Sequence, residues 1–298
     1  MPYNIAMAQN DSGDSLIGSC MGRVLAVLLL LIAAPSAAQD GKPQRVVSMN
    51  LCTDELLMLL VPPERIVSIS WLSHQPESAP PGLELIAADI PSNRGLAEEI
   101  IMMQPDLIVA GAFSTRAAVE LLRHLGYDVV DFASEDDFAD MRVNIRLMGQ
   151  ATGETARAEA LVAELDARLA ALPGDSSADA PIFADLAANN FVSGEGTLPA
   201  AIANAAGYRT LGQALGFAGQ RQVSLEQVVL AGPDLVSFGT DYARPPALAT
   251  QALRHPALRR VAGNAEHVEI PGRLWACGAP GAVRAAELLA ATHADARE

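Results

Sequence analysis

The chain has 298 residues, and half of them are hydrophobic although only 4% are aromatic. This length allows two cores of ordinary size, built mainly from aliphatic side chains. The net charge is −15 and the isoelectric point about 4.7. Because an acidic surface repels phosphate backbones and anionic membranes, no nucleic-acid partner is expected, although the acidity is also explained by a role in solubility alone.

The N-terminal region has the three parts of a secretory signal. A basic start at Met21–Arg23 precedes an apolar run, Val24–Ala34, and small residues follow at Pro35–Ala38. The run is too short to span a bilayer comfortably. We therefore predict a signal peptide over residues 1–38, in which residues 1–20 are interpreted as an upstream extension from a mis-assigned start, and an exported mature chain.

Strands and helices are expected to alternate up to residue 132, which is typical of a parallel sheet with helical crossovers. A helix capped by Thr53 or Asp54 is expected to end at Leu60, before two prolines. An irregular segment, Trp71–Pro76, follows the second strand. The expected strands are Arg45–Met49, Glu64–Ser70, Leu107–Ala110 and Tyr127–Phe132, and a further helix is expected over Thr115–Leu125.

Two helices are predicted next, over Phe138–Gly149 and over Glu154–Leu172, with Thr152 as the cap of the second. We interpret residues 151–173 as a long rigid helix that links an N-terminal lobe, 44–150, to a C-terminal lobe, 180–298. A plain surface helix of the first lobe is the alternative. The second lobe is expected to contain strands at Pro181–Ala187 and Glu266–Ile270 and helices at Thr197–Gly207, Leu253–Val261 and Gly281–His293.

One stretch occurs twice. Leu96–Gly111 and Ser224–Gly239 align with Glu98 on Glu226, and both continue through Pro-Asp-Leu to a glycine. Each copy reads as a short helix that begins at a glutamate, ends before a proline and leads into a buried strand. The repeat predicts two related Rossmann-like α/β lobes with parallel sheets, although Pro-Asp-Leu before a strand is also a common α/β ending.

Ligands of open α/β sheets bind beyond the carboxyl ends of the strands. This rule predicts a cleft between two lips, one from each lobe. The first lip contains Asn50–Thr53, Trp71–His74, Gly111–Ser114 and Phe132–Ser134, and the second contains Ala188–Gly196, Gly239–Arg244 and Gly272–Cys277. Trp71 and Trp275 fall on opposite lips and, with Phe113 and Tyr242, predict an apolar cleft for a large ring-bearing ligand. Each tryptophan could instead simply pack its own lobe.

The sequence contains no P-loop and no nucleophile elbow, and Ser193–Gly196 is only half of a dinucleotide fingerprint. The five histidines lack metal-ligand spacing, so neither a metal site nor a bound cofactor is expected. A thiol enzyme built from Cys52 and His74 is the alternative function.

After export, Cys52 and Cys277 would lie in an oxidising compartment, where two thiols often pair. Closing so long a loop would stabilise the fold by about 5 kcal/mol in the chain-entropy model. Two free thiols are the alternative.

Taken together, these residues resemble the periplasmic binding proteins that deliver ferric siderophores, haem or cobalamin to ABC importers. The resemblance covers about residues 44–292 and depends on the order of several motifs. They are Arg45–Ser48 with Asp54–Leu56, the two glutamate and Pro-Asp-Leu units, Gly194–Leu198, Ala205–Gly207 and His255–Leu258.

The resemblance implies a monomeric periplasmic receptor with two lobes joined by one helix, and membrane permease subunits as its partners. Glu98 and Glu226 match the positions through which family members dock on the transporter. Both residues would also be favourable in the first turn of any helix, because of the helix dipole.

The ligand is expected to be a metal chelate or a corrinoid. Trp71–Pro76 is similar to a segment that lines the cleft of cobalamin carriers. His74 with Tyr242 suits haem, and arginines at 94, 116, 244 and 273 suit an anionic siderophore. The candidate ligand-binding residues are Asn50, Cys52, Trp71, His74, Phe113, Ser193, Tyr242, Arg273 and Trp275. A bond between Cys52 and Cys277, which departs from the family pattern, would cross this cleft.

Overall fold

The computed structural model describes residues 41–79, 82–174, 177–238, 255–264 and 266–295. The chain divides into two units, Met1–Lys42 and Pro43–Glu298, and every element below belongs to the second. The predicted signal peptide, residues 1–38, lies outside the described residues. No helix in the described ranges has the length and apolar character needed to cross a membrane.

The N lobe, residues 43–152, is built on a five-stranded parallel sheet with the order β3-β2-β1-β4-β5. Val46 lies opposite Leu107, and Ser48 lies opposite Val109. The chain leaves β1 toward β2 and β3, and returns to the other side of β1 with β4, so the strand order reverses between β1 and β4. The strands are β1 (Val46–Ser48), β2 (Ile66–Ser70), β3 (Ser92–Asn93), β4 (Leu107–Gly111) and β5 (Val129–Phe132).

Helices cover both faces of this sheet because its strands are apolar on both sides. One face, with Val47 and Ile108, contacts α4 and α5. The other, with Val46 and Val109, contacts α2, α3, α6 and α7. The helices are α2 (Leu51–Leu60), α3 (Glu84–Asp89), α4 (Ala97–Met102) and α5 (Arg116–His124), and short 3-10 turns occupy Pro63–Arg65 and Trp71–His74.

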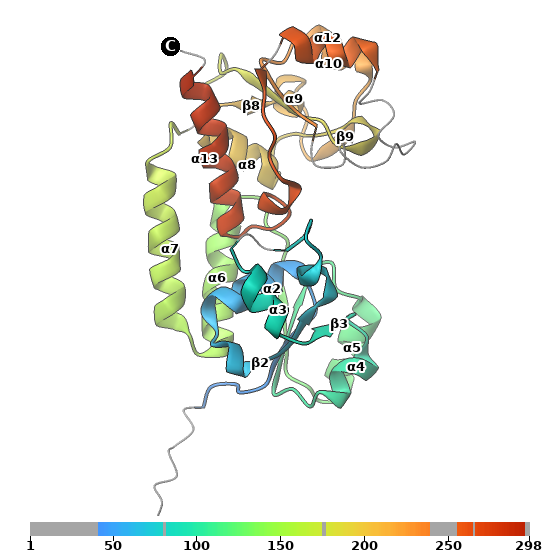
Figure 1. Ribbon diagram of the computed structural model, residues 1–298, viewed down its shortest axis with the longest axis vertical. Helices are drawn as coiled ribbons and strands as arrows, with labels where there is room; N and C mark the ends of the chain where they lie inside the picture. The colour runs from blue at the N-terminus through green and yellow to red at the C-terminus, as the bar shows by residue number, and fades with distance from the viewer. Residues whose placement is uncertain (1–40, 80–81, 175–176, 239–254, 265, 296–298) are drawn as a thin grey trace, which may run out of the picture. The chain divides into compact units, whose positions relative to one another are not determined.

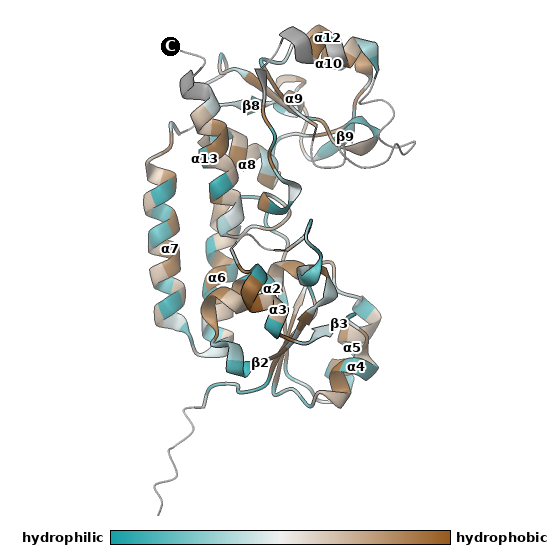
Figure 2. Cartoon of the chain, in the orientation of Figure 1, coloured by the Kyte–Doolittle hydropathy of each residue, from teal (hydrophilic) through white to brown (hydrophobic). Residues whose placement is uncertain are grey.

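Helices α6 (Phe138–Thr152) and α7 (Thr155–Ala170) form an antiparallel pair that lies side by side in Figure 1. Gly153 separates them in the left-handed conformation. Helix α7 buries Ala158, Val162 and Leu165 in the N-lobe core, and in Figure 2 it alternates between teal and brown along its length. Its last turn reaches α13, where the Arg168 guanidinium contacts the Glu287 carboxylate at 2.8 Å. The domain limits 44–150, 151–173 and 180–298 stay predictions.

The C lobe, residues 180–295, contains a four-stranded parallel sheet with the order β11-β10-β6-β8 and an antiparallel ribbon of β7 and β9. Strand order again reverses between β6 and β10, so the second sheet repeats the reversal of the first. The strands are β6 (Ile182–Asp185), β7 (Phe191–Ser193), β8 (Arg209–Thr210), β9 (Gln220–Gln222), β10 (Leu235–Ser237) and β11 (Glu266–His267).

The C-lobe sheet is also covered on two faces. Phe183 and Leu235 contact α8 and α13 on one face, whereas Ala184 and Val236 contact α9, α10 and α12 on the other. The helices are α8 (Leu198–Ala205), α9 (Leu211–Ala214), α10 (Leu225–Ala231), α12 (Pro256–Asn264) and α13 (Pro280–Asp295), with 3-10 turns at Ala188–Asn190 and Gly272–Leu274. Two α/β lobes with parallel sheets, as predicted, are confirmed.

Two predicted helix caps are wrong. Helix α2 starts at least three residues earlier than expected because Asn50 caps it, through Oδ1 and the Cys52 amide. Asp54 instead points inward, where it accepts hydrogen bonds from the Ser70 amide and the Ser73 hydroxyl. Thr152 ends α6, and its hydroxyl donates to the Met148 carbonyl at 2.7 Å, so it does not cap α7.

Candidate ligand-binding site

A cavity of about 430 Å³ is lined by residues of both lobes. This volume is within the usual range for small-molecule sites. The N-lobe wall contains Asn50, Cys52, Thr53, Leu56, Gly111–Phe113 and Phe132–Asp136, and the C-lobe wall contains Gly196–Pro199, Gly219, Gln220, Trp275 and Ala276.

The N-lobe wall lies where the strand order of the sheet reverses. Asn50 follows β1 and Gly111 ends β4, and these two strands are neighbours that lead to opposite edges of the sheet. A methyl group on Gly111 would come within 2.8 Å of the Asn50 side chain, so glycine is needed for their close approach. Phe113 projects beyond them with 82% of its surface exposed, which leaves its ring available to a ligand.

Two acidic residues, Glu135 and Asp136, also belong to the N-lobe wall. The Glu135 carboxylate accepts a hydrogen bond of 2.5 Å from the Asn144 amide. Burial raises the pKa of Glu135 above its ordinary value, and hydrogen bonds from Asn144 and Gly278 oppose this effect in part. Among the described lining residues there is no arginine, lysine or histidine, so this part of the cavity carries no positive side chain.

The C-lobe wall is formed by Trp275 and by the start of α8. The Trp275 ring lies 6.1 Å from the ring of Phe183, centroid to centroid, so a buried core residue supports its inner side. Thr197 caps α8 by accepting a hydrogen bond from the Ala200 amide, and Pro199 is tolerated in the first turn, as predicted. This wall therefore presents one large ring and a helix N-terminus to the cavity.

Four of the predicted ligand-binding residues line the cavity, namely Asn50, Cys52, Phe113 and Trp275. Four do not, namely Trp71, His74, Ser193 and Arg273, and Tyr242 lies outside the described residues. Sequence reasoning missed Leu56, Glu135, Asp136, Thr197–Pro199, Gly219 and Gln220 as lining residues. The caps of α8 and the acidic pair after β5 were the signals that could have pointed to them.

Three of the four residues outside the lining have other partners, whereas the buried Nε of Arg273 has no hydrogen-bond partner. Trp71 is 38% exposed and has the Arg94 guanidinium 5.4 Å from its ring centroid. A ring nitrogen of His74 lies 3.0 Å from the Ile90 carbonyl oxygen. Ser193 is buried, and its amide donates to the Asp185 carboxylate.

A disulfide bond joins Cys52 of α2 to Cys277, which precedes α13, with 5.2 Å between the Cα atoms. The bond therefore connects the two lobes at the edge of the cavity. A thiol enzyme needs a free thiolate at Cys52 and a base beside it. The Cys52 sulfur is taken up by the disulfide, and His74 does not line the cavity. The structure therefore does not bring together the two groups that a thiol enzyme would need. In the described ranges, no group of three or more His, Cys, Asp or Glu side chains is placed to hold a metal ion.

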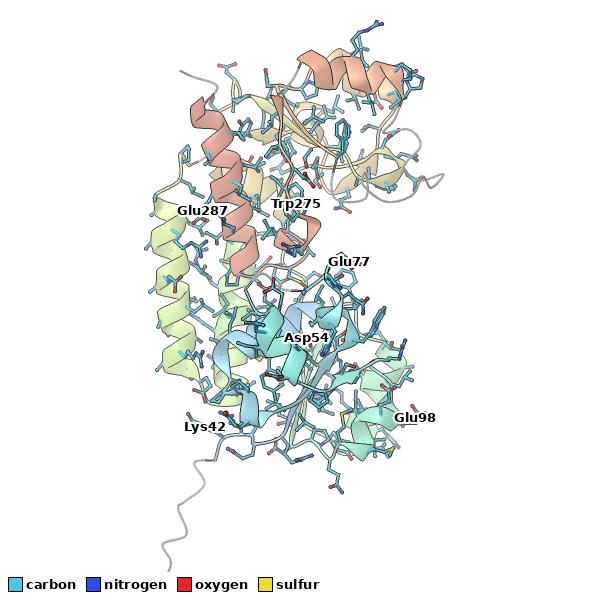
Figure 3. The ribbon with its side chains drawn as sticks, viewed as in Figure 1. Lys42, Asp54, Glu77, Glu98, Trp275 and Glu287 are labelled. Atoms are coloured by element: carbon cyan, nitrogen blue, oxygen red, sulfur yellow. A yellow bond between two sulfur atoms is a disulfide. The ribbon has the colours of Figure 1, made fainter. Side chains whose placement is uncertain are left out.

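The two repeated glutamates lie away from the cavity. Glu98 is exposed in the first turn of α4, and Glu226 is exposed in the first turn of α10. Figure 3 shows Glu98 on the outer side of the N lobe, far from Trp275. The repeat thus places one exposed carboxylate at the same position of each lobe.

Comparisons with known proteins agree with this arrangement. A family model described as "Periplasmic binding protein" matches residues 46–262. The cobalamin-binding protein of Halobacterium salinarum is 25% identical over 247 residues, which cover 78% of this chain and 66% of that protein. The chain thus spans just under two thirds of this relative's length.

Solved structures show the same fold at low sequence identity. A periplasmic haem-binding protein from Pseudomonas aeruginosa superposes with a TM-score of 0.66 and 19% identity, over 84% of this chain and 92% of the other. A periplasmic vitamin B12 binding protein of Vibrio cholerae superposes with a TM-score of 0.61 and 16% identity, over 86% of this chain and 99% of the other.

The family match covers most of the chain, and the structural neighbours share both lobes. Members of this family are substrate-binding proteins of the haem, siderophore or cobalamin type that work with ABC importers, whose permease subunits are their partners in the membrane. A sequence with two related α/β lobes, and a cavity lined from both of them, leads to the same assignment. The chain therefore belongs to the periplasmic binding protein family.

Proposed function

We propose that this protein captures a corrinoid of the cobalamin type and delivers it to an ABC importer. The observation that carries the choice of ligand is the charge of the cavity. Its described lining combines aromatic and neutral polar side chains with Glu135 and Asp136 and contains no cation. A carboxylate wall disfavours an anionic ligand, whereas a chelate whose periphery consists of neutral amides can accept and donate hydrogen bonds there.

The other two ligand classes of the family fit this lining less well. Haem carries two carboxylates and takes His or Tyr as an axial ligand. Of the two candidates, His74 lies outside the lining and Tyr242 lies outside the described residues. Anionic siderophores need arginines, but Arg94, Arg116 and Arg273 do not line the cavity, and Arg244 lies outside the described residues. The 25% identical relative named a cobalamin-binding protein supports the same choice.

Fluorescence titration tests this proposal, because Trp275 lines the cavity and Trp71 does not. In the Trp71→Phe variant of residues 39–298, cyanocobalamin is expected to quench emission saturably at one equivalent, after correction for its absorbance. The matched Trp275→Phe variant, which keeps Trp71, should show weaker quenching at saturation, because Trp71 does not contact the ligand. Haemin and a panel of ferric siderophores serve as competitors. Saturable quenching by haemin or a siderophore alone would reject the corrinoid, and no response to any compound would reject a metal-chelate receptor.

We infer that Glu98 and Glu226 dock on the permease subunits, and a second feature of the repeat supports this role. Four residues after each glutamate, on the same helix face, stands a large apolar side chain. Met102 is 84% exposed and Leu230 is 86% exposed, and the repeat aligns them with each other. One acidic and one apolar group per lobe suit a partner that presents the same basic and apolar surface twice, as a pair of similar permease subunits does.

Removing both carboxylates should therefore separate docking from ligand capture. The Glu98→Ala/Glu226→Ala variant is expected to lose roughly tenfold or more of its stimulation of the importer's ATPase, since two charge-assisted contacts are removed. Its cyanocobalamin affinity should stay unchanged, because neither residue lines the cavity. The control variant, Asp128→Ala/Glu269→Ala, also removes one exposed carboxylate from each lobe and should stimulate normally. Equal losses in both variants would reject specific docking.

A further inference from the structure

The segment Trp275–Gly281 belongs to the C lobe but is held by groups of the N lobe. It connects the cavity wall at Trp275 and Ala276 to the first turn of α13. Cys277 and Ala279, with Val283 in the next turn, are buried in the same apolar cluster as the N-lobe strands β1 and β4. The middle of this short stretch is therefore packed in the core of the opposite lobe.

Helix α2 supplies two of the groups that hold the segment. Cys52 forms the disulfide with Cys277, and Glu55, one turn further on, accepts a hydrogen bond from the Gly281 backbone. Residues three apart lie on the same face of a helix. One face of α2 thus holds both Cys277, three residues before the start of α13, and a backbone amide of the first turn of α13.

Glu135 supplies the third group. One of its carboxylate oxygens accepts a hydrogen bond from the Gly278 amide at 3.4 Å, while Asn144 of α6 holds the other at 2.5 Å. A methyl group on Gly278 would lie 2.4 Å from the Glu135 side chain, so only glycine permits this contact. Two carboxyl groups therefore face the N-terminus of α13, where unpaired backbone amides and the helix dipole favour acceptors.

These contacts act on the cavity directly, since Cys52 and Glu135 are themselves lining residues and Trp275 and Ala276 precede Cys277. We propose that Cys52, Glu55 and Glu135 are positioning residues for ligand capture, which clamp Trp275–Gly281 to the N lobe and keep the Trp275 wall preformed. Any separation of the two lobes is then confined to the side of the cavity opposite the disulfide. The link to capture depends on the proposed function, whereas the clamp itself does not.

A ligand-free distance measurement tests the clamp. Spin labels carried by p-acetylphenylalanine at the exposed positions 120, on α5, and 227, on α10, report the distance between the lobes without added thiols. The wild type is expected to give one narrow distance distribution. The Cys52→Ser/Cys277→Ser variant should give a clearly broader one. The Arg168→Ala variant, which breaks the contact between α7 and α13 instead, should stay narrow.

An equally narrow distribution in the cysteine-free variant would overturn the clamp, and so would equal broadening in Arg168→Ala. If the cysteine-free protein does not fold, Gly278→Ala replaces it. This variant keeps both cysteines but forces Glu135 away from the segment, and it should also broaden the distribution.

The effect on capture is measured separately, with cyanocobalamin as the probe. If the clamp is removed, the dissociation rate of cyanocobalamin should rise about tenfold, because the complex must then also keep the Trp275–Gly281 segment ordered. If the wild type binds no cyanocobalamin, the proposed ligand is rejected but the distance result still decides the clamp. If the distributions broaden while the dissociation rate stays unchanged, the positioning role is rejected and the receptor function stands.

Discussion

The Phe183→Ala variant is expected to lose about 3–5 kcal/mol of its free energy of unfolding, the cost of removing a large aromatic side chain from a filled core. Phe183 is fully buried in β6 and has the Tyr208 ring 6.4 Å away and the Trp275 ring 6.1 Å away. Its loss should also release Trp275 toward the space left behind. Chemical denaturation gives the first effect, and cyanocobalamin titration of the folded fraction gives the second.

Phe113→Ala is the matched control, because it removes the same ring from the opposite wall of the cavity. Phe113 is 82% exposed, so its removal should change stability by less than about 0.5 kcal/mol. Ligand affinity should nevertheless fall, since the ring lines the cavity. A stability loss as large as that of Phe183→Ala would contradict the placement of Phe113.

The free energy of unfolding is expected to fall as the pH rises from about 4 to 8. Burial raises the pKa of Asp54 to about 7 and that of Glu55 to about 8, from ordinary values of 3.8 and 4.5. Over this interval the folded state holds protons that the unfolded state has released, so the stabilisation is complete below pH 4 and lost above 8. A pKa difference of one is worth about 1.4 kcal/mol, so a loss of a few kcal/mol is expected.

Other carboxylates make the free energy of unfolding rise with pH in the acidic range. Hydrogen bonds from Arg168 lower the pKa of Glu287, and those from Arg146 lower the pKa of Glu159, so their contribution is lost as the pH falls through the acidic range. Maximum stability is therefore expected near pH 4. Denaturation at a series of pH values checks this, and Asp54→Asn should flatten the slope between pH 4 and 7. A wild-type stability that rises over that range would contradict the protonated state of these residues.

Local patterns predicted the fold well. The apolar runs before Asn50 and Gly111 are strands because each is bounded by a turn or cap, and the repeat around Glu98 and Glu226 indicated two similar lobes. The wrong caps show the limit of such reasoning. Thr53 and Asp54 are both good capping residues, but only the packing of α2 on β2 decides that Asp54 faces inward.

The lining residues that directly follow sheet strands could be predicted from the sequence, whereas those supplied by other elements could not. Asn50 and Phe113 follow strands β1 and β4, so the rule of strand ends located them. Trp71 and His74 also follow a strand, but β2 lies away from the point where strand order reverses. Thr197–Pro199 could not be found this way, because α8 reaches the cavity through the packing of α8 against α13.

The disulfide closes the chain into a covalent ring from Cys52 to Cys277, which contains all the described strands except β1. A single cut by a protease anywhere within this ring opens it without producing two separate molecules. Nicked protein should therefore run as one species until it is reduced, with both walls of the cavity still attached to each other. The ring thus gives the protein a tolerance to proteolysis that its packing alone does not supply.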